Sequence, residues 1–166
     1  MSANVKVYSW HGAGAGSGAD ITSADVRFRL SDVDTGDTAN PVVIPAAGTN
    51  YSWLKNLRLY ATTSPASIID NLKFYSDGVA WATGITVKGK ASDTYVDPVA
   101  NGASILAGAT DLYTYTTGAP LSLTGSISNP TTGDFGQFVV AQLLMASTAS
   151  PGVSTGRTYY FRYDEI

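Results

Sequence analysis

Three aspartates close together in the sequence are the residues best placed to do chemistry. Asp32, Asp34 and Asp37 put three carboxylates within six positions, and carboxylate oxygens are ligands that Ca²⁺ prefers. The spacing departs from an EF-hand loop, because Gly36 holds the fifth place, Asp37 the sixth, and Val43 the place of the final glutamate. Aspartates are also common in turns, where their side chains bond the local backbone. We therefore expect no resident metal or cofactor and keep the three aspartates as Ca²⁺ candidates.

A second candidate chemistry is nucleophilic or phosphate-binding, in the stretch that follows the single histidine. His11 precedes Gly14-Ala15-Gly16-Ser17-Gly18, which has a serine between glycines but no helix pattern after it. A catalytic serine needs a nearby base and an orienting acid, and a phosphate loop needs a lysine where this chain has Asp20. We expect a flexible Gly-rich loop here, no catalytic residue, and a protein that is not an enzyme.

The composition excludes further classes. Charged residues make up 14% of the chain, the formal net charge is −3, and there is no cysteine. Few cations argue against nucleic acid as a partner, and the absence of cysteine removes thiolate chemistry and disulfides. No apolar run is long enough for a membrane helix, and the N-terminus has no basic segment followed by an apolar one, so we expect neither a membrane partner nor a secretion signal.

The elements that must position these residues have an apolar period of two, which is typical of strands. The longest apolar run, residues 138–145, suits a strand that is buried on both faces. The turn at Ser76-Asp77-Gly78 contains Asp-Gly, which is typical of a β-hairpin, so it predicts a hairpin between the strands on either side. The segments that predict strands are 5–10, 26–30, 41–45, 51–59, 68–75, 81–89, 94–96, 112–115, 121–123, 138–145 and 158–163.

Two details of this pattern carry predictions of their own. The apolar parity changes between Leu54 and Leu57, which a bulge at Lys55-Asn56 would explain. The phrase Asn-Leu-Arg-Leu-Tyr at 56–60 recurs as Asn-Leu-Lys-Phe-Tyr at 71–75. We interpret this echo as two similar strands of one sheet, since a true duplication would need more matching positions.

Short strands separated by turn signals, without a long amphipathic helix, predict an all-β antiparallel β-sandwich. Its topology is expected to be jelly-roll-like, with an immunoglobulin-like arrangement as the alternative. Residues 1–166 are expected to form one domain, in which 1–20 is a candidate extended arm with its Gly-rich loop.

The surface points to assembly. Glycine, alanine, serine and threonine make up nearly half of the chain, and a surface with so little charge suits a protein covered by its neighbours. We expect a homo-oligomer in which the N-terminal arm and the last strand make contacts. The interface candidates are Val5, Val7, Tyr8, Trp10, His11, Tyr159, Phe161 and Tyr163.

Several phrases resemble virion structural proteins of tailed bacteriophages. They are Tyr51 to Tyr60, Ile68 to Gly78, Gln142 to Gly152 and Phe161 to Glu165, which together make up 37 of the 166 residues. The resemblance implies a β-rich protein of the capsid or tail, and within that class a capsid decoration (cement) protein fits the size best.

The resemblance also implies where the protein acts. Its partners would be the major capsid protein or other virion proteins, and its location the virion, after synthesis in the host cytoplasm. A neck, tail or fibre-base subunit is the first alternative. A lectin-like receptor-binding domain that uses Trp, Tyr and Asp is the second.

Overall fold

The computed structural model describes residues 2–32, 39–98, 107–152 and 155–166 as an all-β protein with one short 3₁₀ helix. Within these ranges no helix is long and apolar enough to span a membrane. The elements are β1 (Asn4–His11), β2 (Ser17–Asp20), β3 (Thr49–Tyr51), β4 (Lys55–Thr63), β5 (Ile68–Ser76), β6 (Ile85–Ser92), β7 (Thr110–Asp111), η1 (Leu112–Thr114), β8 (Leu121–Ser122), β9 (Ile127–Ser128), β10 (Gly133–Ala146) and β11 (Tyr159–Glu165).

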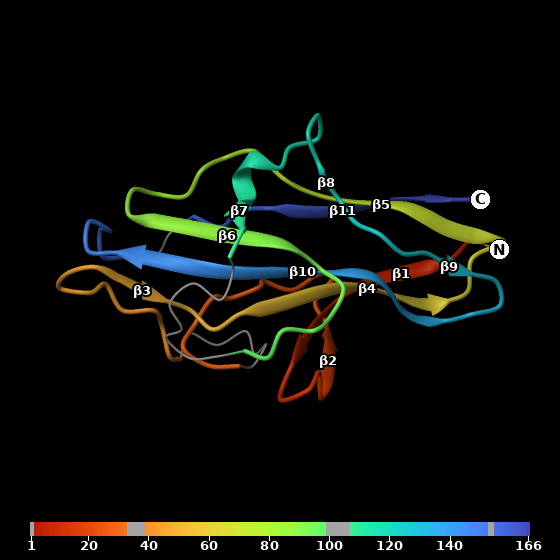
Figure 1. Ribbon diagram of the computed structural model, residues 1–166, viewed down its shortest axis with the longest axis horizontal. Coiled ribbons are helices and arrows are strands. Elements are labelled where there is room, and N and C mark those ends of the chain that lie inside the picture. The colour runs from red at the N-terminus through yellow and green to blue at the C-terminus, as the bar shows by residue number, and fades with distance from the viewer. Residues whose placement is uncertain (1, 33–38, 99–106, 153–154) are drawn as a thin grey trace.

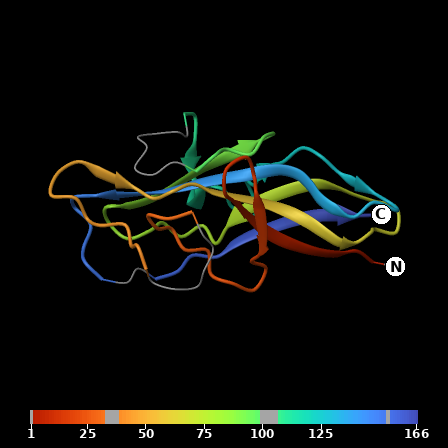
Figure 2. The same cartoon turned by 90° about the horizontal axis from the view of Figure 1, so that it is seen from below.

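The described strands form two antiparallel sheets. The larger has seven strands in the order β2-β1-β4-β10-β6-β7, with β3 also on β10, and we call it sheet A. The smaller has four strands in the order β11-β5-β8, with β9 also on β5, and we call it sheet C. The molecule is elongated, and both termini lie at the same end (Figure 1, Figure 2). The antiparallel β-sandwich expected from the sequence is confirmed.

The central strand of sheet A is β10, which lies between β4 and β6. Residues 138–143 are all buried, as the continuous apolar run predicts. Val139, Ala141 and Leu143 pack into the core between the sheets, whereas Phe138 and Val140 belong to a separate cluster. Successive side chains of a strand point to opposite faces, so β10 needs apolar cover on both sides.

The core between the sheets takes alternate residues from paired strands. Sheet A contributes Leu57, Leu59 and Ala61 from β4, and sheet C contributes Leu72 and Phe74 from β5. The period-two pattern of the sequence therefore identifies the inward faces of both strands correctly.

The second cluster lies on the outer face of sheet A and explains the change of parity after Leu54. Leu54, Phe138 and Val140 are buried there, with Trp10, Tyr95, Val96 and Ala109 packed against them. The predicted bulge at Lys55-Asn56 is wrong, because β4 pairs with β1 in regular register through Asn56. The register shift lies instead in β10, between Phe135 and Val139.

The N-terminal strand is not a free arm. β1 pairs with β4 over almost its whole length and with β2 on its other edge. The Gly-rich stretch is the loop of the β1–β2 hairpin, and it is held from outside the hairpin. Gly12 N–H donates to Asp32 at 2.6 Å, Gly14 N–H donates to Asp97 at 2.8 Å, and Tyr95 O–H donates to the Gly12 carbonyl at 2.7 Å. Removing residues 1–18 would therefore remove an interior strand of the sheet.

Other predictions are corrected. The expected strand at 94–96 is not formed, and residues 112–114 form the 3₁₀ helix η1 in place of a strand. Residues 26–30 form no strand, because their only ladder contact is a single bridge from Arg29 to Pro41, although Val26 and Phe28 do pack against the core. The turn after β5 starts a crossover to sheet A and not a hairpin, since β5 and β6 belong to different sheets. The two echo segments likewise lie in opposite sheets, on β4 and β5.

The two termini are joined by Glu165, the only glutamate of the chain. Its carboxylate accepts hydrogen bonds from Ser2 Oγ and from Ala3 N–H, both at 2.7 Å. Ala66 N–H donates to it more weakly, at 3.4 Å. These donors lower the pKa of the Glu165 carboxyl, the Ser2 hydroxyl most of all. The side chain thus ties the end of sheet C to the start of sheet A.

One prediction concerns the close approach of Gly84 to residue 149. Gly84 has a φ of +79°, and a Cβ there would lie 2.4 Å from the backbone nitrogen of Ala149. Gly108 has a φ of +77° with nothing within 4 Å of such a Cβ, so it is a matched control. We expect Gly108→Ala to cost about 1 kcal/mol of unfolding free energy, and Gly84→Ala about 1–3 kcal/mol more. Urea unfolding measures both, and equal losses would contradict the packing.

A second prediction concerns pH. A carboxyl whose pKa is lowered by folding stabilises the protein above its ordinary pKa of 4.5, and that contribution is lost as pH falls through the folded value. Glu165→Gln should lower the melting temperature near neutral pH, and the difference from the wild type should shrink between roughly pH 6 and pH 3. A difference that stays constant over this range would show that the carboxylate charge does not hold the termini.

Candidate functional site

The structure gives only part of the Ca²⁺ candidate. Asp34 and Asp37 lie outside the described residues. Asp32 is described, and one of its oxygens binds the Gly12 N–H of the hairpin loop. No group of three or more acidic or histidine side chains suited to a metal occurs within the described ranges. The role that the structure shows for Asp32 is to hold the loop in place.

The region around His11 has a structural role as well. His11 ends β1 and lies opposite Ser17 in the hairpin. Gly18 lies beneath the indole of Trp10, where a Cβ would come within 3.1 Å of the ring. The glycine at this position therefore serves packing, and the Trp10 indole in turn joins the outer cluster of sheet A.

The interface candidates divide between the core and the outer faces. Val5 and Val7 pack against the core, as do Tyr159, Phe161 and Tyr163 of β11. The Trp81 indole N–H donates to Tyr159 Oη at 3.2 Å, and burial raises the pKa of the Tyr159 phenol. Tyr8 and Trp10 lie on the outer face of sheet A. None of the candidates lies on the outer face of sheet C.

The outer face of sheet A carries a stacked tyrosine pair. Tyr8 of β1 and Tyr60 of β4 lie with ring centroids 4.4 Å apart and planes 9° from parallel. Both rings are partly exposed. Arg58 of β4 is on the same face and lies over the Phe138 ring at 4.7 Å. Stacked aromatic pairs combine apolar contact area with polar edges, which suits a surface that another molecule covers.

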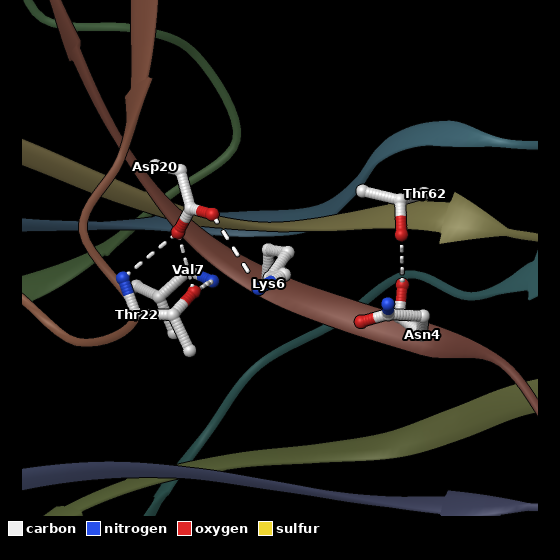
Figure 3. Close-up of polar contacts among 6 residues, drawn as sticks. All are labelled: Asn4, Lys6, Val7, Asp20, Thr22 and Thr62. Carbon is white, nitrogen blue, oxygen red and sulfur yellow. Dashed lines mark hydrogen bonds and ion pairs between the residues drawn. The ribbon is translucent and has the colours of Figure 1, made fainter.

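Polar contacts at the β1–β2 edge hold this face in place, as Figure 3 shows. Asp20 lies 3.6 Å from Lys6 Nζ and accepts from the N–H and the hydroxyl of Thr22 at 2.9 and 2.6 Å. These hydrogen bonds lower the pKa of the Asp20 carboxyl. Thr22 Oγ1 accepts from Val7 N–H at 2.9 Å, and Thr62 Oγ1 donates to the Asn4 carbonyl at 3.0 Å.

The outer face of sheet C carries a second stacked pair. Tyr75 of β5 and Tyr160 of β11 lie with centroids 5.0 Å apart and planes 19° from parallel. Tyr160 is 44% exposed. Lys73 and Arg162 lie directly opposite each other on the same two strands. Two cations beside a stacked pair of tyrosines thus face outward.

The sequence echo accounts for the likeness of the two faces. Tyr60 and Tyr75 are the last residues of the two phrases, and each stacks on a tyrosine from a strand near one terminus. Sequence reasoning missed Tyr60, Tyr75 and Tyr160, although the alternation with buried Leu57, Leu59, Leu72 and Phe74 marks the outward positions. Comparisons with protein-family models, curated proteins and solved structures match nothing.

The described surface also contains a polar pocket of about 500 Å³ beside the bulge of β10. Two glycines allow the chain to cross there, since a Cβ on Gly125 would lie 2.7 Å from Gly136 Cα. The lining residues are Arg58, Asp93, Thr124, Gly125, Ser126, Ile127, Ser128, Thr131, Asp134, Phe135, Gly136 and Gln137.

The charged groups of this pocket are already fixed by partners. Arg58 forms an ion pair with Asp134, and its Nε donates to the Gly136 carbonyl at 2.7 Å. The Gln137 amide donates to Asp93 at 2.7 Å and accepts from Thr124 N–H at 2.9 Å. Carboxylates, a guanidinium and hydroxyls held in this way can exchange several hydrogen bonds with a polyhydroxy ligand.

Proposed function

We propose that the chain is a non-enzymatic structural protein of a bacteriophage virion, a decoration protein that binds and stabilises the assembled shell. The single observation that carries the proposal is the pair of outward faces, each with a stacked tyrosine pair and cations beside it. A subunit within a shell needs one face for the shell and another for its neighbours. The phage-like phrases and the small, uncharged surface residues support the same role.

The mechanism follows from mass action. A protein that binds the assembled shell better than the free subunits shifts the equilibrium toward the shell. When many copies surround one particle, a bound copy holds its neighbours at a high effective concentration. Weak individual contacts are then sufficient to keep the copies on the shell. Tyrosine is among the residues that contribute most at such contacts, because its ring has a large area and few rotatable bonds.

We assign the shell contact to the outer face of sheet A. This sheet is the wider of the two. Two ion pairs flank its tyrosine pair, Lys6 with Asp20 and Arg58 with Asp134. Charges that are already paired cost less to cover than unpaired ones. The face of sheet C is then left for neighbouring subunits.

The test of this function uses virions of the phage that encodes the chain. Cryo-electron microscopy should show the sandwich at symmetric positions on the capsid surface. Density at the neck, tail or fibre base would support the alternative structural role, and absence of the chain from the particle would overturn the proposal. The recombinant protein should bind particles that lack it, and Tyr8→Ser with Tyr60→Ser should weaken that binding about tenfold or more. Tyr75→Ser with Tyr160→Ser removes the stacked pair of the other sheet, and at low occupancy, where neighbouring copies do not touch, it should bind the particles like the wild type.

The polar pocket supports a second candidate, carbohydrate binding. Its hydroxyl, amide and carboxylate groups fit a saccharide, which is recognised by many cooperating hydrogen bonds. On a glycan array with and without a chelator, a specific signal would favour this function, and a Ca²⁺-dependent one would add the metal. Asp93→Asn should weaken such binding about tenfold, whereas Asp25→Asn, which is exposed and outside the pocket, should leave it unchanged.

A further inference from the structure

The edge strand β11 combines a free backbone edge with an unusual arrangement of charges. It pairs with β5 alone within the described part of the chain. Ile166 and Ile68 exchange backbone hydrogen bonds at 2.9 and 3.1 Å, and Asp77 N–H donates to the Thr158 carbonyl at 3.0 Å. Even-numbered residues of β11 therefore direct their backbone groups to β5. Those of Tyr159, Phe161, Tyr163 and Glu165 point to the free edge.

This edge lacks several of the features that usually prevent strands from pairing. Natural edge strands are blocked by proline, by a bulge, by a short length or by charged side chains, above all lysine. The charges of β11 are Arg162 and Asp164, which have opposite signs, and Glu165, whose carboxylate is bound by Ser2 and Ala3. β11 has seven residues with neither proline nor lysine. The register between β11 and β5 shifts where Asp70 to Lys73 lies opposite Arg162 to Asp164. The extra residue is in β5, so β11 itself stays regular.

The charges on the outer face of sheet C are paired like with like. Arg162 lies directly opposite Lys73, and Asp164 lies directly opposite Asp70. Like charges opposite each other on neighbouring strands are destabilising. Lys73 donates to Ser122 Oγ at 3.0 Å and Asp164 accepts from Asn71 Nδ2 at 2.7 Å, but neither bond joins opposite charges. Arg162 has no ion pair among the described residues.

We propose that β11 pairs antiparallel with β11 of a second copy of this chain, about a twofold axis at Tyr163. This register places Arg162 of each copy opposite Asp164 of the other. Across the joined sheet, Lys73 and Arg162 of one copy are followed by Asp164 and Asp70 of the other. The two basic residues of each copy therefore lie beside two acidic residues of the second copy. A strand that pairs with itself forms an isologous interface, which closes as a dimer.

Geometry and charge select this register over its neighbours. The residues with free backbone groups are odd-numbered, so the registers that allow hydrogen bonds have their twofold axis at a residue. An axis at Arg162 would oppose two arginines, and an axis at Asp164 would oppose two aspartates. An axis at Phe161 would place Arg162 opposite Tyr160 and leave Asp164 opposite Thr158. The axis at Tyr163 forms two ion pairs, and they occupy the non-hydrogen-bonded positions, where side chains are closest.

The pairing names a partner for the assembly proposed above and rests on that proposed function for its biological use. It also fits the division of the two faces, because it uses the edge and outer face of sheet C and leaves the outer face of sheet A free. The carboxylate of Glu165 remains bound to Ser2 and Ala3 on the inner side of β11. The termini can therefore stay joined when the second copy docks.

Sedimentation equilibrium of the full chain at low salt tests the pairing. The wild type should form a dimer that weakens as salt is added. Arg162→Asp and Asp164→Arg should each weaken the dimer about tenfold or more, because each turns two attractions into repulsions. A mixture of the two variants should form a heterodimer, since positions 162 and 164 are then both acidic in one variant and both basic in the other. Circular dichroism of each variant shows that it is folded.

The outcomes separate this inference from the proposed function. A wild type that stays monomeric at all concentrations, or single variants that dimerise like the wild type, would overturn the β11 pairing, whether or not the protein binds virions. A dimer with the expected charge dependence in a protein absent from virions would support the pairing and overturn the decoration role. Failure of the mixture to associate, when the wild type does, would overturn the register.

Discussion

Strand β10 must be buried on both faces, and the rest of the sandwich is arranged to meet this requirement. Its inward residues need sheet C, and its outward residues, Phe138 and Val140, need cover that no second sheet of the described chain provides. Trp10, Tyr95 and Val96 supply that cover, and the Asn56 amide binds the backbone of Val96 through both of its polar atoms, at 2.9 and 3.1 Å. The hairpin loop is held over the same region, so a stretch with the composition of a linker becomes part of the architecture.

The strands nearest the termini complete both sheets and also make both outer surfaces. β1 brings Tyr8 to Tyr60, and β11 brings Tyr160 to Tyr75. Glu165 joins the two strands at one end of the molecule, so the integrity of the termini and the presentation of the surfaces are linked. The surface positions are therefore held in place before any partner binds, which lowers the entropy cost of an association.

Charge is scarce in this chain, which makes its placement informative. On sheet A the cations Lys6 and Arg58 have acidic partners within the chain. On sheet C, Lys73 lies opposite Arg162 and Asp70 lies opposite Asp164, and none of these four residues forms an ion pair within the described part of the chain. In the proposed pairing, a second copy running in the opposite direction places opposite charges beside these like-charged pairs. The two faces therefore differ in the kind of partner that they favour, although the sequence echo gives them the same aromatic pair.

Local alternation of apolar residues was enough to establish the all-β class, the doubly buried strand at 138–145 and the inward faces of β4 and β5. It could not establish which strands share a sheet: the two echo segments lie in different sheets, and residues 26–30 alternate like a strand but form only a single bridge. Pairing depends on contacts between residues far apart in the chain, such as β1 with β4 and Ala3 with Glu165. Three features follow from the packed fold and not from any local pattern: the Gly-rich segment is a held loop, Tyr60 and Tyr75 face opposite sides, and like charges meet across β5 and β11. The physical reason is that strand register is fixed only when the whole core is packed.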